Sequence, residues 1–142
     1  MDPSPKKILY VEDELNVGST LKERLEAEGY EVEWQRTRAG GLEAARTQTF
    51  HLALLDIALP DGTGFQIAEE LRKKSVHTAI VFLTAFGTPE DRIRGLELGA
   101  EDYIAKPFHL KELLLRLRNV LKRTQSITET PELDGVVVGR AK

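Results

Sequence analysis

Acidic residues stand where two apolar segments of the chain end. Residues 8–11 are followed directly by Glu12 and Asp13, and the apolar run 52–55 is followed by Asp56. Short, nearly unbroken apolar runs are typical of strands buried on both faces in a parallel sheet. A Pro-Asp-Gly turn comes soon after Asp56, and the carboxyl ends of such strands border the crevice where ligands bind. We therefore interpret Asp56 as the reactive group, although a strand-end aspartate can also simply cap the following loop.

A hydroxyl and an ammonium group follow two further apolar segments. The run 79–83 ends in Thr84, and residues 103–105 are followed by Lys106. Three carboxylates at one crevice repel each other unless a cation neutralises them, and oxygen ligands without His or Cys suit Mg²⁺. Lys106 adds a positive charge suited to a phosphate oxygen. Together these groups fit the formation of an aspartyl phosphate, with Asp56 as the nucleophile and the Thr84 hydroxyl bonded to a transferred oxygen.

Helical patterns fill the segments between the strands. Apolar residues recur there at helical spacing, and Gly29 and Gly99 stand where two helices should stop. Tyr30, Val32 and Trp34 alternate with polar residues, which predicts a half-exposed strand near the sheet edge. The expected order is strand 8–11, helix 14–28, strand 30–35, helix 39–47, strand 51–56, helix 64–74, strand 79–83, helix 89–99, strand 103–105 and helix 110–121. This alternation predicts a doubly wound α/β domain.

The composition is that of one ordinary domain with tails. The chain has 142 residues, of which 41% are hydrophobic, and this is enough to bury a core. Its net charge of −3 gives no reason to expect binding to nucleic acid or to an anionic membrane. The absence of cysteine excludes disulfides and thiolate metal sites, and no apolar run has the length of a membrane span or a signal peptide. We expect a soluble, cytoplasmic protein with no membrane partner.

The sequence divides into three parts. Residues 1–5 form a polar leader, residues 6–124 carry the alternating strand and helix patterns, and residues 125–142 begin with a polar linker. Three consecutive valines, at positions 136–138, start an apolar segment that the chain does not complete. We therefore expect the linker to lead into the start of a truncated output domain.

Short motifs, in order along the chain, resemble those of the receiver domain of two-component response regulators. They are Glu12-Asp13, Leu55-Asp56 with Pro60 and Gly62, Thr84-Ala85, and the segment from Gly99 to Phe108. The resemblance covers residues 6–124 and is closest to the receivers of winged-helix DNA-binding regulators. It implies a flavodoxin-like (βα)5 fold with a five-stranded parallel sheet, in a phosphorelay protein that regulates transcription.

By this resemblance, Asp56 accepts a phosphoryl group from the phosphohistidine of a sensor histidine kinase. Mg²⁺ would be held by Glu12, Asp13, Asp56 and the main-chain carbonyl of Ala58. Position 12 holds Glu rather than Asp, so direct binding and binding through a water molecule both remain open for it. The protein would be a signalling module rather than an enzyme. It would catalyse only its own phosphotransfer and a slow autodephosphorylation, because the side chains of Ala58 and Phe86 cannot orient a hydrolytic water by hydrogen bonds.

The resemblance also assigns roles to the remaining strand-end residues. Lys106 would contact the phosphoryl group and precede a cis proline, Pro107. Thr84 and Tyr103 would form a switch pair, in which the hydroxyl moves to the phosphate and the tyrosine ring turns inward.

A homodimer is expected on phosphorylation, through the fourth helix, the fifth strand and the fifth helix. Both signs of charge occur on this surface, so it can be self-complementary about a two-fold axis. Glu97 lies on the same surface. By resemblance to the winged-helix subfamily, the pairs expected across the axis are Arg92 with Glu112, Asp102 with Arg116, and Glu101 with Arg118. DNA would be bound only through an output domain that is absent from this chain.

Two other classes of protein fit part of the pattern. A Mg²⁺-dependent phosphatase of the haloacid dehalogenase type also phosphorylates an aspartate on an α/β sheet. Its nucleophile is normally followed two residues later by a second Asp, where this chain has Ala58. A flavin- or nucleotide-binding module has a similar architecture, but no loop here has the glycine spacing of a phosphate cradle. The receiver interpretation takes precedence, with the phosphatase as its alternative.

Overall fold

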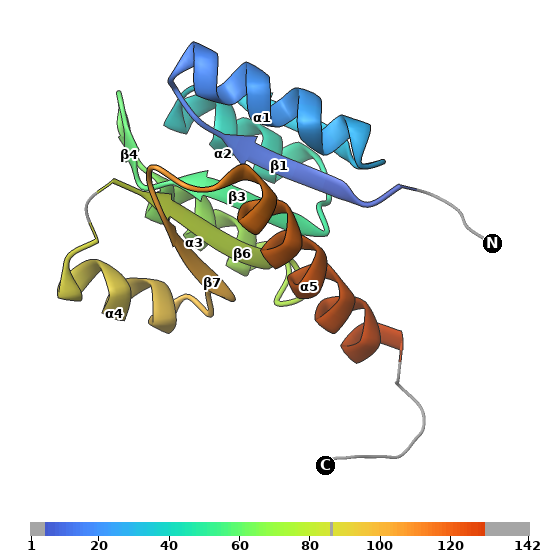
Figure 1. Cartoon of the computed structure of the whole chain (residues 1–142). Coiled ribbons are helices and arrows are strands. Elements are labelled where there is room, and N and C mark those ends of the chain that lie inside the picture. Colours follow the sequence, from blue (N-terminus) through green and yellow to red (C-terminus); the bar gives the residue numbers. More distant parts are fainter. Residues whose placement is uncertain (1–4, 86, 130–142) are drawn as a thin grey trace.

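Five parallel strands form the central sheet, in the order β2-β1-β3-β6-β7 (Figure 1). The computed structural model describes residues 5–85 and 87–129. The sheet strands are β1 (Lys7–Val11), β2 (Glu31–Gln35), β3 (Leu52–Asp56), β6 (Ala79–Thr84) and β7 (Asp102–Ala105). Each neighbouring pair is parallel, so the chain crosses over the sheet between strands. This is the doubly wound, flavodoxin-like fold predicted from the sequence, and its strand order reverses between β1 and β3.

Helices cover both faces of the sheet (Figure 1). They are α1 (Leu15–Ala27), α2 (Arg38–Thr47), α3 (Gly64–Lys74), α4 (Pro89–Glu97) and α5 (Leu110–Glu129). Residues of α1 and α5 share one core cluster, and residues of α2 and α3 share the other. Helix α4 has nine residues and buries only Gly95, so it contributes less to the core than the other helices.

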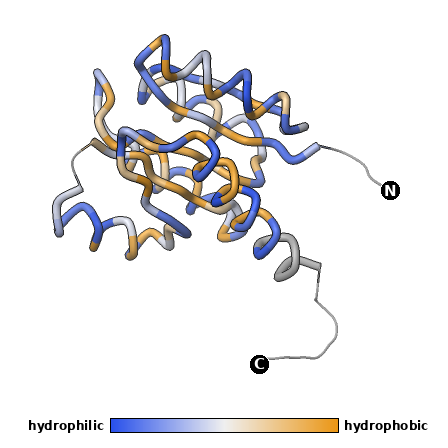
Figure 2. The backbone as a smooth tube through the Cα atoms, in the orientation of Figure 1, coloured by the Kyte–Doolittle hydropathy of each residue, from blue (hydrophilic) through white to orange (hydrophobic). Residues whose placement is uncertain are grey.

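The central strand β3 shows why its sequence is apolar throughout. Leu52 and Leu54 face the cluster with α1 and α5, whereas Ala53 and Leu55 face the cluster with α2 and α3. Side chains alternate between the faces of a strand, and helices cover both faces here, so every position must be apolar. Figure 2 shows the hydrophobic residues concentrated in these inner strands. Strand β2 lies at the edge and is only partly buried, as its alternating sequence predicts.

The helix ends follow the local sequence. Thr88 precedes α4, and its Oγ1 accepts a hydrogen bond from the main-chain N–H of Asp91 at 3.0 Å, which caps the helix. Gly29 and Gly99 end α1 and α4 with φ angles of 100° and 77°, a left-handed conformation that side chains rarely adopt. These are the two stops that the sequence indicated.

A small hairpin follows β3 and was not predicted. Strands β4 (Ala58–Leu59) and β5 (Gly62–Thr63) pair antiparallel on either side of Pro60 and Asp61. The Asp61 carboxylate accepts hydrogen bonds from the main-chain N–H groups of Arg38 and Ala39, at 2.7 and 3.0 Å. The hairpin is thereby fastened to the first turn of α2, which fixes the loop beside Asp56.

Helix α5 is longer than the sequence pattern predicted. It continues to Glu129, so residues 125–129 of the expected linker are helical. The rest of that linker, residues 1–4 of the expected leader, and Phe86 lie outside the described residues. The division of the sequence into leader, receiver and linker stays a prediction.

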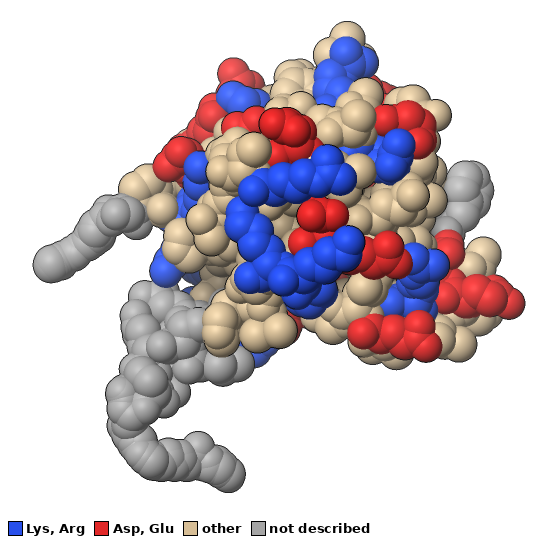
Figure 3. Space-filling model, turned by 180° about the vertical axis from the view of Figure 1, so that it is seen from behind, with Lys and Arg blue, Asp and Glu red and all other residues tan. Residues whose placement is uncertain are grey.

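The exterior carries both signs of charge. On the face seen from behind, basic and acidic side chains are interspersed (Figure 3). Ion pairs between neighbouring helices include Arg46 with Glu70 and Arg94 with Glu69. No helix within residues 5–85 and 87–129 combines the length and the apolar character that crossing a membrane requires.

Candidate functional site

Three carboxylates come together at the carboxyl edge of the sheet, as predicted. Glu12 and Asp13 follow β1, and Asp56 ends β3, which pairs directly with β1. One oxygen of each side chain lies within 4.8 Å of the other two. Glu12 is fully buried, Asp56 is 5% exposed, and Asp13 is half-buried. Carboxylates this close and this poorly solvated repel each other, so the site requires positive charge.

The ammonium group of Lys106 contacts two of the carboxylates. Its Nζ lies 2.8 Å from Glu12 Oε1 and 2.8 Å from Asp56 Oδ2. Burial alone would lower the pKa of Lys106, but its hydrogen bond to Asp56 and its contact with Glu12 outweigh burial and raise that pKa. Burial also raises the pKa of Glu12, and the contact with Lys106 opposes this rise without cancelling it. Lys106 is therefore held in its charged form between two buried carboxylates.

The donor set fits a hard divalent cation. Three carboxylates face one ammonium group, so negative charge remains in excess, and the donors are all oxygens. Mg²⁺ is usually held by one or two carboxylates and keeps several waters. Glu12, Asp13 and Asp56 are the side chains that would hold it. Ala58 lies beside them, with its main-chain N–H donating to Asp56 Oδ1 at 3.3 Å, and its carbonyl as a fourth ligand stays a prediction.

Thr84 and Tyr103 lie on the neighbouring strands β6 and β7, and Tyr103 stands two residues before Ala105, the position that pairs with Thr84. Thr84 ends β6 and is 8% exposed. The ring of Tyr103 packs against Phe82 with 5.5 Å between centroids, and its hydroxyl donates to the main-chain carbonyl of Asp91 in α4. Burial raises the pKa of Tyr103 to about 12. A turn of this ring would break a contact that holds α4, and whether Thr84 and Tyr103 move together stays a prediction.

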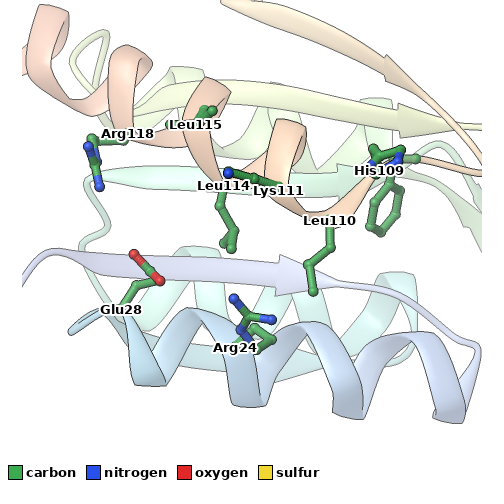
Figure 4. A pocket seen from close by; sticks show the side chains of 9 residues that line it. Arg24, Glu28, His109, Leu110, Lys111, Leu114, Leu115 and Arg118 are labelled. Carbon is green, nitrogen blue, oxygen red and sulfur yellow. The ribbon is translucent and has the colours of Figure 1, made fainter.

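A groove begins beside Lys106 and runs between α1 and α5. The Lys106–Pro107 peptide bond is cis, as the resemblance implied. Next to it is a hollow of about 640 Å³ whose apolar lining comprises Val17, Leu21, Pro107, Phe108 and Leu110. A second hollow of about 690 Å³ shares Phe108 and Leu110 and continues between the two helices, where charged residues including Arg24, Glu28 and Lys111 line it (Figure 4). The sequence did not reveal the groove, because its apolar residues belong to helical stripes that predict only core packing.

Comparison with known proteins decides the family. Residues 8–118 match the family model described as the response regulator receiver domain. The chain belongs to this family. A receiver domain protein from Methanospirillum hungatei JF-1 has a similar structure, with a TM-score of 0.84 and 34% identity, covering 87% of this chain and 99% of that chain. The non-phosphorylated HemR receiver domain from Leptospira biflexa gives a TM-score of 0.77 and 48% identity, covering 82% of this chain and 94% of that chain.

Longer relatives of the receiver domain are also found. The probable transcriptional regulator ycf27 of Cyanophora paradoxa is 44% identical over 131 residues, which are 90% of this chain and 53% of that protein. The chain spans about half the length of the curated relatives that it matches. These matches therefore identify the receiver domain alone.

The receiver domain pairs several of the predicted interface charges within one chain. Arg116 Nη1 lies 3.1 Å from Asp102 Oδ1, and Arg116 Nη2 lies 3.0 Å from Glu112 Oε2. Glu101 contacts Arg123 of the same chain at 3.4 Å, and its predicted pairing with Arg118 across a dimer axis stays a prediction. The remaining interface candidates, which are exposed on α4 and α5, are Arg92, Glu97 and Arg118. The sequence pattern found the charged surface but could not distinguish pairs within a chain from pairs between chains.

Removing the Lys106 charge should destabilise the receiver domain in a pH-dependent way. We expect Lys106→Met to lower the free energy of unfolding by roughly 2–4 kcal/mol near neutral pH, because two buried carboxylates lose their cation. The destabilisation should be smaller at about pH 5. Folding raises the pKa of the Glu12 carboxyl, so this group stabilises the folded protein at low pH, and that stabilisation is lost as pH rises. Urea unfolding at both pH values measures this.

Lys73→Met is the matched control for this measurement. The Lys73 side chain is 76% exposed and pairs only loosely with Glu70, at 3.8 Å. Its replacement should change stability little at either pH. An equal loss at both pH values for Lys106→Met would contradict the assigned role of Glu12.

Proposed function

We propose that Asp56 of this receiver domain accepts a phosphoryl group from a sensor histidine kinase, and that phosphorylation switches the protein to its active state. The observation that carries the proposal is the 2.8 Å contact between Lys106 and Asp56, beside two more carboxylates with oxygens suited to Mg²⁺. This arrangement combines a nucleophile, a fixed cation and metal ligands, which are the parts that phosphoryl transfer needs.

The transfer forms one bond and breaks one. An oxygen of Asp56 attacks phosphorus, a P–O bond forms as the P–N bond of the phosphohistidine breaks, and the electron pair of that bond stays with the imidazole. Bound Mg²⁺ would neutralise charge on the phosphoryl oxygens. Lys106 would contact one phosphoryl oxygen, and the Thr84 hydroxyl would donate to another. Slow hydrolysis would follow, because Ala58 has no side chain that orients water.

The groove between α1 and α5 is the surface on which we expect the kinase to dock. It opens beside Lys106, and its lining near the site is largely apolar, with Val17 from α1 and Phe108 from the loop before α5. An apolar groove suits one face of an amphipathic helix. A kinase helix seated there would bring its phosphohistidine next to Asp56.

Control of transcription is the proposed output. The matching relative from Cyanophora paradoxa is named a probable transcriptional regulator, and this chain covers 53% of it. We therefore propose that a DNA-binding output domain accompanies this receiver in a cytoplasmic regulator, and that DNA contacts come only from that domain. The phosphatase alternative gains no support, because the family match is to receivers and position 58 holds Ala.

Phosphorylation of Asp56 can be tested with a small donor. With acetyl phosphate and Mg²⁺, intact-mass measurement should show the gain of one phosphoryl group, and a chelator should prevent it, because the carboxylates repel an incoming dianion. Asp56→Asn should gain nothing. Glu43→Gln, which removes an exposed carboxylate of α2 outside the carboxylate cluster, should be labelled like the wild type. Full labelling of Asp56→Asn would overturn the assignment.

A phosphorylation-dependent homodimer through α4, β7 and α5 is the proposed consequence. Arg116 pairs with Asp102 within one chain, so a dimer that uses this pair would exchange an intrachain contact for an interchain one. Exposed pairs are worth little individually, so the exchange itself costs little. Loss of the hydrogen bond from Tyr103 to the carbonyl of Asp91 would free α4 to move. The movement of this helix would then decide whether the two surfaces meet.

A mixing experiment separates interchain from intrachain pairing. With Mg²⁺ and beryllofluoride, the wild type should dimerise in sedimentation runs, while Arg116→Asp and Asp102→Arg should each stay monomeric. An equal mixture of the two variants should dimerise, because both interchain pairs then join opposite charges while both intrachain pairs remain like-charged. The double variant restores both kinds of pair and serves as the control for folding. A mixture that stays monomeric while the wild type dimerises would contradict the interchain assignment.

A further inference from the structure

The end of strand β2 binds the main chain of the acidic pair. The indole N–H of Trp34 donates to the main-chain carbonyl of Glu12 at 3.0 Å. The main-chain carbonyl of Gln35 accepts from the N–H of Glu12 at 3.0 Å. The guanidinium of Arg36 donates twice to the carbonyl of Asp13, from Nε at 3.2 Å and from Nη2 at 3.0 Å. Three consecutive residues of the edge strand and its following loop therefore fix both residues that carry metal-binding carboxylates.

The Trp34 ring is itself held by two other elements. It stacks on Tyr10 of β1, with 6.4 Å between ring centroids and 22° between their planes. On α1, it lies so close to Gly18 that an added Cβ would come within 2.0 Å of its Cζ2 atom. Only glycine lets the helix approach the ring this closely. Trp34 is thus confined between a strand and a helix, so its N–H points at Glu12 from a fixed position.

We propose that Trp34 is a positioning residue for the metal-binding acidic pair, with Arg36 in a supporting role. The inference rests on the proposed function, because it concerns the Mg²⁺ site. Glu12 and Asp13 stand just past Val11, the last β1 residue that pairs with β2 and β3, and the bond from the N–H of Glu12 to Gln35 is the last main-chain bond to β2. Repulsion among the carboxylates favours moving this segment away from Asp56. Hydrogen bonds to its carbonyls oppose that movement and keep the carboxylates convergent, as outer-shell contacts do at many metal sites.

Replacing Arg36 should change the Mg²⁺ affinity in opposite directions, depending on whether the residue acts through its charge or by positioning Asp13. Arg36 is an exposed cation close to Asp13, so its charge alone disfavours binding of another cation. Replacing it with Gln should therefore tighten Mg²⁺ binding if only charge matters. If the two hydrogen bonds to Asp13 position the ligand, Arg36→Gln should weaken Mg²⁺ binding instead. Arg46→Gln, an exposed arginine of α2 that pairs with Glu70, is the control for the same charge change.

The binding test is a calorimetric titration with Mg²⁺ alone on this chain. Trp34→Phe keeps an aromatic ring against Tyr10 and removes the N–H donor. We expect it to weaken Mg²⁺ binding by about threefold to tenfold, the effect of losing one hydrogen bond to a positioned group. Arg36→Gln should weaken binding by less, and Arg46→Gln should leave it within error of the wild type. Thermal unfolding followed by circular dichroism verifies that each variant is folded.

A spectroscopic measurement on the wild type tests the same contact without relying on a variant that might misfold. Trp34 is the only tryptophan of the chain, so a ¹⁵N-labelled protein has a single indole N–H resonance. This resonance should shift on addition of Mg²⁺ with the midpoint found by calorimetry, because the acceptor carbonyl belongs to a ligand residue. Asp13→Asn should abolish the shift together with the binding.

The outcomes distinguish the two proposals. A wild type that binds no Mg²⁺ would overturn the proposed function and the inference with it. A wild type that binds Mg²⁺ with an indole resonance that does not respond, or with unchanged affinity in Trp34→Phe and tighter binding in Arg36→Gln, would overturn the inference alone. Weakened binding in both variants, with a responding indole resonance, would support it.

Discussion

Repulsion among three carboxylates at one sheet edge is the constraint on which the rest of this structure depends. Two like charges about 5 Å apart repel by roughly 3 kcal/mol at an effective dielectric constant of about 20. Glu12, Asp13 and Asp56 lie within this range, and the burial of Glu12 raises its pKa. Lys106 offsets part of the repulsion through two contacts of 2.8 Å. The remaining negative charge makes the edge receptive to a divalent cation and, with it, to a phosphoryl group.

The parallel sheet is what allows four chain segments to meet at this edge. Strands β1, β3, β6 and β7 are neighbours, and each delivers its last or next residue to the same side. The inner strands are buried on both faces, so their ends are fixed by two core clusters. Helix α4 is different, because it buries a single residue and is tied to the sheet through the Tyr103 hydroxyl. We propose that a chemical change at the sheet edge is passed to α4 through this contact.

The sequence predicted the parts of the fold that depend on apolar spacing. The five sheet strands and five helices lie where the apolar runs, the alternating pattern of the edge strand and the helical spacing placed them, because burial on both sheet faces makes the inner strands apolar throughout. The carboxylate cluster could be predicted because strand ends meet in any doubly wound sheet. The hairpin of Ala58–Leu59 with Gly62–Thr63 is too short to show a period, and the last turns of α5 are polar.

Long-range polar contacts were beyond the reach of sequence patterns. The bond from Trp34 to Glu12 spans 22 residues, and the pair of Arg116 with Asp102 spans 14. Both depend on side-chain conformation after folding, which no local pattern specifies.

The role of Asp56 as the phosphoryl acceptor is tested most directly by a crystal structure with Mg²⁺ and beryllofluoride. We expect beryllium bonded to a carboxylate oxygen of Asp56, with Lys106 and Thr84 contacting fluorine atoms. Beryllofluoride bound elsewhere, with Asp56 still paired to Lys106, would contradict the assignment of Asp56 as the phosphoryl acceptor.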